Sequence, residues 1–162
     1  MNVVVLADTH ITGSGADRLP EAAWKLLRSA DAILHLGDVV GATFLDELRA
    51  LAPVHAVLGN NDRTLVGLLP ERVELDLEGV RVAMIHDSGP RRGREQRLHK
   101  HFPNADLVLF GHSHIPWDAP GIDGQHLFNP GSATQRRSQP QRTLGVVQLA
   151  GGTAIPRIVA LP

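Results

Sequence analysis

The sequence predicts an α/β fold in which two packed β-sheets carry helices on their outer faces. Through residue 58, short apolar segments alternate with segments of helical spacing, which is typical of a parallel sheet with right-handed crossovers. From residue 72 onward, paired alternating segments appear instead, which are typical of β-hairpins. Parallel units followed by hairpins favour two sheets. The length of 162 residues suits one domain that spans residues 1–162.

The first three strands are predicted from short, continuously apolar segments, as expected for strands that are buried on both faces. The two segments between them place their apolar residues on one stripe, which indicates helices. Pro20 stands near the start of the first helix, and Thr43 is the candidate N-cap of the second. The strands are expected at 2–7, 31–36 and 54–58, and the helices at 19–30 and 43–51.

The second half of the chain contains two predicted hairpins. Glu78-Gly79 is typical of a tight hairpin turn, and Gly151-Gly152 is expected to join the last two strands. Pro156 favours an edge position for the final strand. Residues 115–141 are rich in Pro, Gly and Gln and are expected to be mostly loop. Strands are expected at 72–77, 80–85, 107–110, 142–149 and 154–160, and a short polar helix at 94–102.

Composition excludes several classes of protein. The net charge of -1 provides no general attraction to nucleic acid, and the four Phe and two Trp do not support a base-stacking platform. There are no cysteines, so any metal must be bound by nitrogen and oxygen atoms. No apolar run approaches the roughly 20 residues of a membrane span. We therefore expect a cytoplasmic protein without a membrane partner.

Five predicted strands end in polar residues of one chemical kind. A single Asp after a strand is most often a turn former, but five such endings in one fold favour a shared site. Loops at the carboxyl ends of parallel strands gather at one edge of a sheet. The endings are Asp8-Thr9-His10, Gly37-Asp38, Gly59-Asn60-Asn61-Asp62, His86-Asp87 and Gly111-His112-Ser113-His114.

These endings provide the ligands of a metal centre. Imidazole combined with carboxylate and amide oxygen suits Zn, Mn, Fe or Ni better than Ca or Mg. Seven ligands exceed the need of one ion, and with one bridging carboxylate they suit two ions about 3.5–4 Å apart, as in phosphate-ester hydrolysis. We expect two divalent metal ions, with manganese preferred and iron, nickel or zinc as alternatives. The expected ligands are Asp8, His10, Asp38, Asn60, His86, His112 and His114.

The same residues, in this order and spacing, resemble the five motifs of the calcineurin-like metallophosphoesterases. The short chain and its late Asn129-Pro130-Gly131-Ser132 are similar to the small bacterial and archaeal phosphodiesterase subfamily. The resemblance implies a four-layer αββα sandwich with two mixed β-sheets. It also implies a phosphodiesterase that acts on a small-molecule phosphate ester, in which a water held between the ions attacks phosphorus in line.

Carried over residue by residue, the resemblance divides the ligands between two metals. Asp38 would bridge them and, with Asn60 and Asn61, form the catalytic group. Many members have His where this chain has Asn61, and an amide cannot donate a proton to the leaving oxygen. One metal would lie on Asp8, His10, Asp38 and His114, and the other on Asp38, Asn60, His86 and His112.

For several side chains near the motifs, the sequence leaves two roles open. Asp87, where the family usually has Gly, is either a turn residue or an acceptor for an imidazole N–H. Asp62 and Asn129 either orient ligands or serve the loops alone. His35 is expected to be a core histidine. The arginines at 91–94, 136–137 and 63 are either a solvated face or include a group that binds the substrate phosphate.

The motifs leave three functions open. The first is a phosphodiesterase with some monoesterase activity, and the second is a hydrolase dedicated to one nucleotide signal. The third is a non-catalytic scaffold or interaction module, which the seven intact ligands disfavour. A homo-oligomer is left open.

Overall fold

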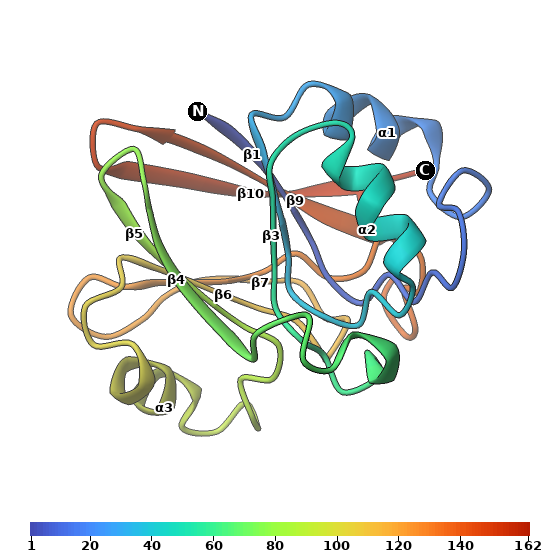
Figure 1. Cartoon of the computed structure of the whole chain (residues 1–162). Coiled ribbons are helices and arrows are strands. Elements are labelled where there is room, and N and C mark those ends of the chain that lie inside the picture. The colour runs from blue at the N-terminus through green and yellow to red at the C-terminus, as the bar shows by residue number, and fades with distance from the viewer.

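Two five-stranded sheets packed face to face form the centre of the molecule, as the computed structural model of residues 1–162 shows (Figure 1). The strand orders are β10-β9-β1-β2-β3 and β4-β5-β6-β8-β7, and both sheets mix parallel and antiparallel pairs. The first sheet contains β1 (Asn2–Leu6), β2 (Ala32–His35), β3 (Val54–Ala56), β9 (Arg142–Ala150) and β10 (Thr153–Leu161). The second contains β4 (Arg72–Leu77), β5 (Val80–Ile85), β6 (Leu107–Phe110), β7 (Trp117–Pro120) and β8 (His126–Asn129).

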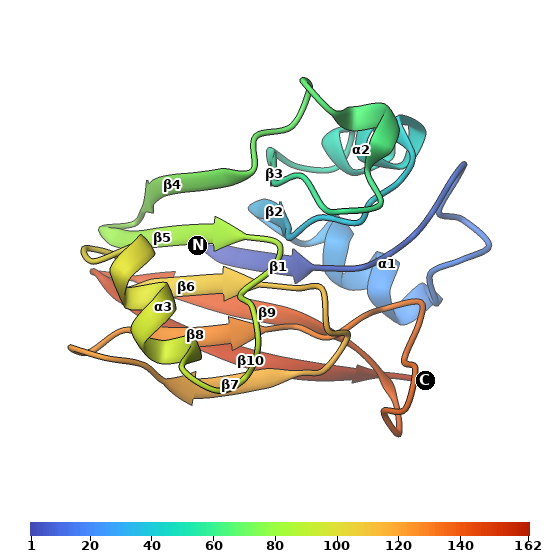
Figure 2. The ribbon, with the colours of Figure 1, turned by 90° about the horizontal axis from the view of Figure 1, so that it is seen from below.

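Helices cover the two outer faces and complete the predicted four-layer αββα arrangement. Helices α1 (Glu21–Arg28) and α2 (Ala42–Arg49) lie on the outer side of the first sheet, and α3 (Arg94–His101) lies on the outer side of the second (Figures 1 and 2). A 3₁₀ turn, Arg63–Leu65, follows β3. None of the helices has the length and apolar character that a membrane span requires.

Each interface between neighbouring layers has its own apolar core. Alternation along β1 shows this directly, because Val4 and Leu6 pack toward the helices whereas Val3 and Val5 pack toward the second sheet. A third, smaller core lies under α3. Strands that are buried on both faces need continuously apolar sequence, which is why these segments could be recognised without their partners.

The parallel strands align the ends that carry the predicted ligands. β1 pairs in parallel with β2, and β2 with β3, while β5 pairs in parallel with β6 in the other sheet. Their carboxyl ends point to the same side of the molecule, as the arrowheads of β1, β5 and β6 show (Figure 2). Loops from both sheets therefore meet at one edge.

Most predicted elements are confirmed, including the hairpin at Glu78-Gly79, where both residues have positive φ as a two-residue turn requires. Pro156 lies in β10, which is an edge strand as predicted. Residues 115–141 are mostly loop, as predicted, but two four-residue strands that the sequence did not predict, β7 and β8, lie among them. β8 has only Leu127 and Phe128 as consecutive apolar residues, too few for a sequence signal.

The helix starts were also misplaced. The first helix begins at Glu21 and ends at Arg28, inside the predicted 19–30, and Pro20 precedes it in an extended conformation. Gly41, not Thr43, is the N-cap of α2, and no side chain caps that helix. Thr43 already lies inside the first turn. Packing of Phe44 and Leu45 against the first sheet, and not a capping hydrogen bond, therefore determines where α2 begins.

Gly145 in β9 allows the two sheets to approach each other closely. A Cβ at this position would lie 2.5 Å from Cε1 of Phe128 in the opposite sheet. We predict that Gly145→Ala lowers the free energy of unfolding by about 1–3 kcal/mol, because the buried ring would have to move. Urea denaturation measures this change.

Gly13→Ala is the matched control, because nothing lies within 4 Å of a Cβ there. Its stability should stay within about 0.5 kcal/mol of the parent chain. Equal stability of the Gly145 and Gly13 variants would contradict the close packing of the sheets.

Candidate metal centre

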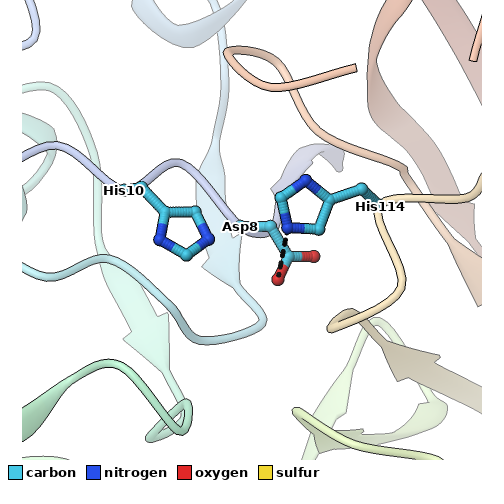
Figure 3. A group of neighbouring side chains, drawn as sticks. All are labelled: Asp8, His10 and His114. Carbon is cyan, nitrogen blue, oxygen red and sulfur yellow. Dashed lines mark ion pairs between the residues drawn. The ribbon is translucent and has the colours of Figure 1, made fainter. Parts of the chain in front are cut away.

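The five strand endings predicted to share a site do lie together at one edge of the two sheets. Two groups of side chains have ligand atoms that all lie within 4.8 Å of one another. The first contains Asp8, His10 and His114, which converge from the loops after β1 and β6 (Figure 3). The second contains Asp8, Asp38 and His86. Residues separated by up to 106 positions thus provide one cluster.

In the first group, three atoms suited to metal coordination have no hydrogen-bond partner. Oδ2 of Asp8 and Nε2 of both His10 and His114 are buried and unpaired. His114 Nε2 lies 3.6 Å from Asp8 Oδ1, and His10 Nε2 lies 3.4 Å from Asp38 Oδ2. Burying polar atoms without partners is costly. A cation among them would satisfy all three.

His86, from the second group, lies close to two further predicted ligands, Asn60 and His112. His86 donates its Nδ1–H to the Leu36 carbonyl at 2.7 Å, so Nε2 of the neutral ring carries a lone pair. That Nε2 lies 2.9 Å from Oδ1 of Asn60, which is also an acceptor. His112 Nδ1 lies 2.9 Å from the same oxygen and 3.3 Å from His86 Nε2. A cation bound there would be coordinated by these nitrogen and oxygen atoms.

Backbone carbonyls fix the orientation of two of the rings. His86 bonds to Leu36 O as described, and His114 donates Nδ1–H to Gln135 O at 2.8 Å. In metal sites the second nitrogen of a ligating imidazole usually makes such a bond, which leaves the first nitrogen free for the ion. Both rings are therefore held in the form that can bind a cation.

Backbone conformation marks the same residues. Nine residues other than glycine have positive φ, and five of them are predicted ligands. Such conformations cost of order 1–3 kcal/mol each and concentrate at functional sites. The strained ligands are Asp8, His10, Asp38, His112 and His114.

The two carboxylates have opposite pKa shifts. Burial and the nearby Asp38 raise the pKa of Asp8 from 3.8 to about 8. Burial alone would also raise the pKa of Asp38, but hydrogen bonds from Asn61 and the nearby His86 and His10 hold it below its usual value. Burial lowers the pKa of His10. The site therefore favours neutral imidazole, the form that ligates metals.

Asn61, expected to belong to the catalytic group, donates two hydrogen bonds to Asp38. Its backbone N–H donates to Asp38 Oδ1 at 2.8 Å, and its side-chain amide donates to Oδ2 at 2.7 Å. The amide therefore orients the carboxylate predicted to bridge the metals. In this arrangement the side chain is engaged by Asp38.

Comparison with known proteins agrees with this geometry. The family model described as the calcineurin-like phosphoesterase superfamily domain matches residues 1–152. The chain belongs to the calcineurin-like phosphoesterase superfamily. Membership supports phosphoesterase activity and the binding of divalent metal ions, and it confirms the resemblance found in the motifs.

A sequence relative and two solved structures are also similar to this chain. The chain is 37% identical over 140 residues to a probable metallophosphoesterase of Methanothermobacter thermautotrophicus, covering 85% of this chain and 80% of the relative. The structure of vacuolar protein sorting 29 from Cryptosporidium parvum matches with a TM-score of 0.84 at 20% identity, covering 99% of this chain and 91% of that one. An archaeal phosphodiesterase matches with a TM-score of 0.76 at 18% identity, covering 98% and 100%. At such identities the two structures show the shared fold alone.

Asp62, for which the sequence left two roles open, hydrogen-bonds to the backbone of two phosphoesterase motifs. It is buried, and its carboxylate accepts backbone N–H bonds from Asp38 at 2.9 Å, Val40 at 2.7 Å and Gly59 at 2.7 Å. Gly59 has no room for a side chain, because a Cβ would lie 2.1 Å from the Asp38 nitrogen. Asp62 thus fixes the loop that carries Asp38. All three bonds are to backbone N–H groups, so Asp62 acts on the loop and not directly on a ligand side chain.

Asn129 has the same kind of role in the last phosphoesterase motif. It is buried and donates to the Gly111 carbonyl at 2.9 Å and to Ser113 Oγ at 3.3 Å. Its side-chain oxygen accepts the Gly131 N–H at 2.8 Å. The loop that carries His112 and His114 is held by these bonds.

Two hydroxyl residues support the first motif and were missed by sequence reasoning. Ser132 donates to the Asp8 carbonyl at 2.8 Å, and Thr134 donates to the Thr9 carbonyl at 2.7 Å. Ser132 was noticed only as part of Asn129-Pro130-Gly131-Ser132. Nothing local to Thr134 signals its role, since its acceptor lies 125 residues away.

His35 and Asp87 can now be assigned. His35 is fully buried, lies 2.9 Å from Thr9 Oγ1 through Nε2, and is a core histidine as expected. Asp87 accepts the Gly89 N–H at 2.7 Å, which makes it a turn residue. Its other oxygen lies 4.0 Å from His112 Nε2, too far for a hydrogen bond.

The candidate arginines differ in their surroundings. Arg63 is exposed on the 3₁₀ turn, and Arg136 donates to the Gln139 carbonyl. Arg137 lies close enough to the centre for its charge to contribute to the lowered pKa of His10 and His114, after burial. Arg94 is buried.

A cavity of about 300 Å³ adjoins the second group of ligands. Asn60 and His86 lie in its wall, and Glu71 and Arg72 place charges of both signs opposite the apolar Leu58 and Ile85. The cavity is large enough for a small ester.

The raised pKa of Asp8 makes stability depend on pH in the metal-free protein. The unfolded chain loses this proton near pH 3.8, whereas the folded chain keeps it to about pH 8. Between these values the folded state binds more protons, so this group lowers stability as pH rises. Asp8→Asn, which mimics the neutral acid, should gain stability over the parent chain by up to roughly 1.4 kcal/mol per pH unit in that window.

Urea denaturation of both proteins in excess chelator, at several pH values from 4 to 8, measures this difference. Contributions of histidines far from Asp8 are shared by the two proteins and cancel, whereas His114, 3.6 Å from Asp8, titrates together with it and belongs to the measured difference. Excess divalent cation should reverse the order, because ionised Asp8 would then be a ligand. Parallel profiles in chelator would show that Asp8 titrates normally.

Proposed function

We propose that this chain is a phosphodiesterase that uses two divalent metal ions, with manganese as the expected ion. The observation that carries the proposal is a pair of neighbouring ligand clusters. In the first, Oδ2 of Asp8 and Nε2 of His10 and of His114 are buried without partners. Asp38 lies beside His10 of this cluster, at 3.4 Å, and beside His86 of the second, at 3.6 Å. When bound, such ions activate water near neutral pH and neutralise charge on the phosphoryl oxygens. Asp8, His10, Asp38 and His114 would hold one ion, and Asp38, Asn60, His86 and His112 the other.

The chain's own contribution is preorganisation of these ligands. Asn61 and Asp62 fix the Asp38 carboxylate and its loop through five hydrogen bonds. Carbonyl acceptors orient His86 and His114. Because the geometry is held before any ion arrives, binding energy is not spent on ordering the loops.

The ester is expected to lie in the cavity beside Asn60 and His86. Arg72 lines it and provides a cation for a non-reacting phosphoryl oxygen. With about 300 Å³ available, the cavity suits a small molecule better than a polymer. Nucleic acid is not supported, since no row of aromatic side chains lines the site.

A diester with a good leaving group suits the residues present. Asn61 replaces the histidine that many members carry, and its amide contacts Asp38. His35 is unsuited as the acid, because burial lowers its pKa to about 3. Departure of the leaving oxygen then depends on its own basicity.

A non-catalytic scaffold is the alternative. The likeness to vacuolar protein sorting 29 suggests it, but at 20% identity that likeness extends to the fold alone. The unpartnered ligand atoms favour a metal enzyme, because a scaffold gains nothing from leaving them buried and unpaired.

Chelation should abolish hydrolysis of an aryl phosphodiester, and Mn²⁺ should restore it. Asp38→Asn should lower kcat/KM by at least about 100-fold even with excess Mn²⁺, because this carboxylate lies between His10 and His86 and is the expected bridge between the two ions. Metal content by mass spectrometry and steady-state kinetics measure the two effects.

The matched control is Asp46→Asn on α2, where the carboxylate is exposed and pairs only with Arg49. It should keep parent activity. If the verified metal-free protein were fully active, the metal mechanism would be wrong. If the chain bound metal but hydrolysed no ester in a panel of diesters and monoesters, the scaffold alternative would replace it.

The leaving group should determine the rate. General acid catalysis is typically worth about 10²–10⁴-fold, and Asn61 cannot supply it. We predict that kcat rises steeply as the leaving-group pKa falls, so that aryl diesters are good substrates and simple alkyl diesters poor ones. Asn61→His should help the alkyl diesters most.

A leaving-group series for both proteins at saturating metal provides the measurement, with a solvent-viscosity control to show that chemistry limits the rate. A flat series under those conditions would mean that another group protonates the leaving oxygen.

A further inference from the structure

Arg94, the first residue of α3, is a buried cation without a partner. Its exposed fraction is 8%, and its guanidinium carbon lies 4.9 Å from the centre of the Phe110 ring and 4.8 Å from that of Trp117. No carboxylate lies within ion-pair distance, its side chain makes no hydrogen bond, and its Nε is fully buried. A buried charge in that state is costly.

Arg97, one turn further along α3, shows the contrast. Its guanidinium donates to the carbonyls of Ser88, Pro90 and Arg92 and so braces the loop before the helix. Arg97 has a structural task that its hydrogen bonds explain. Arg94 has none, although it is the more buried of the two.

A second cation lies beside Arg94. The guanidinium of Arg91 is 4.9 Å from the centre of the same Trp117 ring. The positive charges of Arg91 and Arg94 thus both lie close to the centre of one indole ring, at 4.9 Å and 4.8 Å. Cation–π attraction compensates only part of the repulsion between them. The indole Nε1–H of Trp117 is itself buried without an acceptor. Donors therefore gather here, whereas the metal centre gathers acceptors.

Arg91, Arg94 and Trp117 line a small cavity. It has a volume of about 110 Å³ and is lined by Arg91, Arg94, Ser113, Ile115 and Trp117. One water occupies about 30 Å³ in the liquid, so the cavity has room for a carboxylate or a phosphate group. The amino end of α3, which begins at Arg94, adds positive potential.

One residue of the cavity wall is a chain neighbour of two predicted metal ligands. Ser113 lies between His112 and His114 in the chain, and consecutive Cα atoms are about 3.8 Å apart. The sequence had left the arginines at 91–94 as either a solvated face or a phosphate-binding group. Burial of Arg94 excludes the first reading for this residue.

We propose that the Arg91–Arg94–Trp117 cavity binds an oxyanion of the substrate, so that the preferred substrate is a phosphate ester with a second anionic group. This inference rests on the proposed function. The reacting phosphate lies at the metal ligands, and the second carboxylate or phosphate accepts N–H groups from the guanidinium groups of Arg91 and Arg94, beside the Trp117 ring. Arg94 and Trp117 are thus specificity determinants.

Direct binding is tested without any turnover. The metal-free protein is titrated with acetate in one arm and methyl phosphate in the other, and the indole N–H resonances are followed by NMR. The chain has two tryptophans, so Trp24 is the internal control. The Trp117 resonance should shift saturably at millimolar anion while that of Trp24 stays in place. The arm with tighter binding identifies the kind of anion.

Two variants test the donors. Arg94→Met removes the charge but keeps the length and suits the aromatic surroundings, so the shift should disappear. Arg94→Lys keeps the charge without the fork and should bind more weakly, which guards against misreading an unfolded Met variant. Arg92→Met is the control, because Arg92 lies in the same loop, is exposed and does not line the cavity. It should bind as the parent does.

Kinetics test the link to the substrate. Two aryl phosphodiesters are compared that differ only in a carboxylate or a carboxamide on the second ester group. The ratio of their kcat/KM values should fall at least about tenfold in Arg94→Met and remain unchanged in Arg92→Met, since a hydrogen bond to a charged group is lost.

The outcomes separate the two proposals. Absence of a saturable Trp117 shift overturns the anion site, whatever the enzyme hydrolyses. A shift with no change in the kinetic ratio overturns the role in substrate selection. If no ester is hydrolysed at all, the proposed function fails, while the NMR titration still decides the anion site.

Discussion

The face-to-face packing of the two sheets is the constraint on which the rest of the structure depends. Ligands come from β1, β2 and β3 in one sheet and from β5 and β6 in the other, so their distances are set by the apolar layer between the sheets. That layer includes Val5 and Phe128, and Gly145 allows the close approach. Packed cores change in discrete steps, not continuously, which keeps the ligand positions fixed.

Around this frame the loops hold conformations that are unfavourable by themselves. Positive φ at Asp8 and Asp38, unpaired imidazole nitrogens and a carboxyl with a strongly raised pKa are all concentrated at one edge. The loops that carry these residues are themselves well bonded, as the three backbone N–H groups that donate to Asp62 illustrate. Such a local departure from good packing and pairing is typical of a site whose stability depends on a ligand.

The sequence predicted the layers and the gathering of polar strand endings at one edge, because both depend on local signals. Continuously apolar strands such as 107–110, each followed by polar motif residues, can be recognised without knowing their neighbours. The strand at 126–129 could not, because its identity depends on pairing with β6 and β7. The roles of Ser132 and Thr134 could not be predicted either, since their hydrogen-bond acceptors lie more than 120 residues earlier in the chain. The burial of Arg94 depends on Phe110 and Trp117 from two other strands.

The wide separation of the ligands along the chain also affects folding. Asp8 and His114 follow strands of different sheets, and Ser132 must return across 124 residues to bond to the Asp8 carbonyl. Contacts of such long sequence separation form slowly, because chain entropy is lost before they stabilise anything. A cation can therefore bind tightly only to the finished fold and stabilises it by mass action. Metal availability in the surroundings would then control how long each molecule survives, quite apart from whether it turns over substrate.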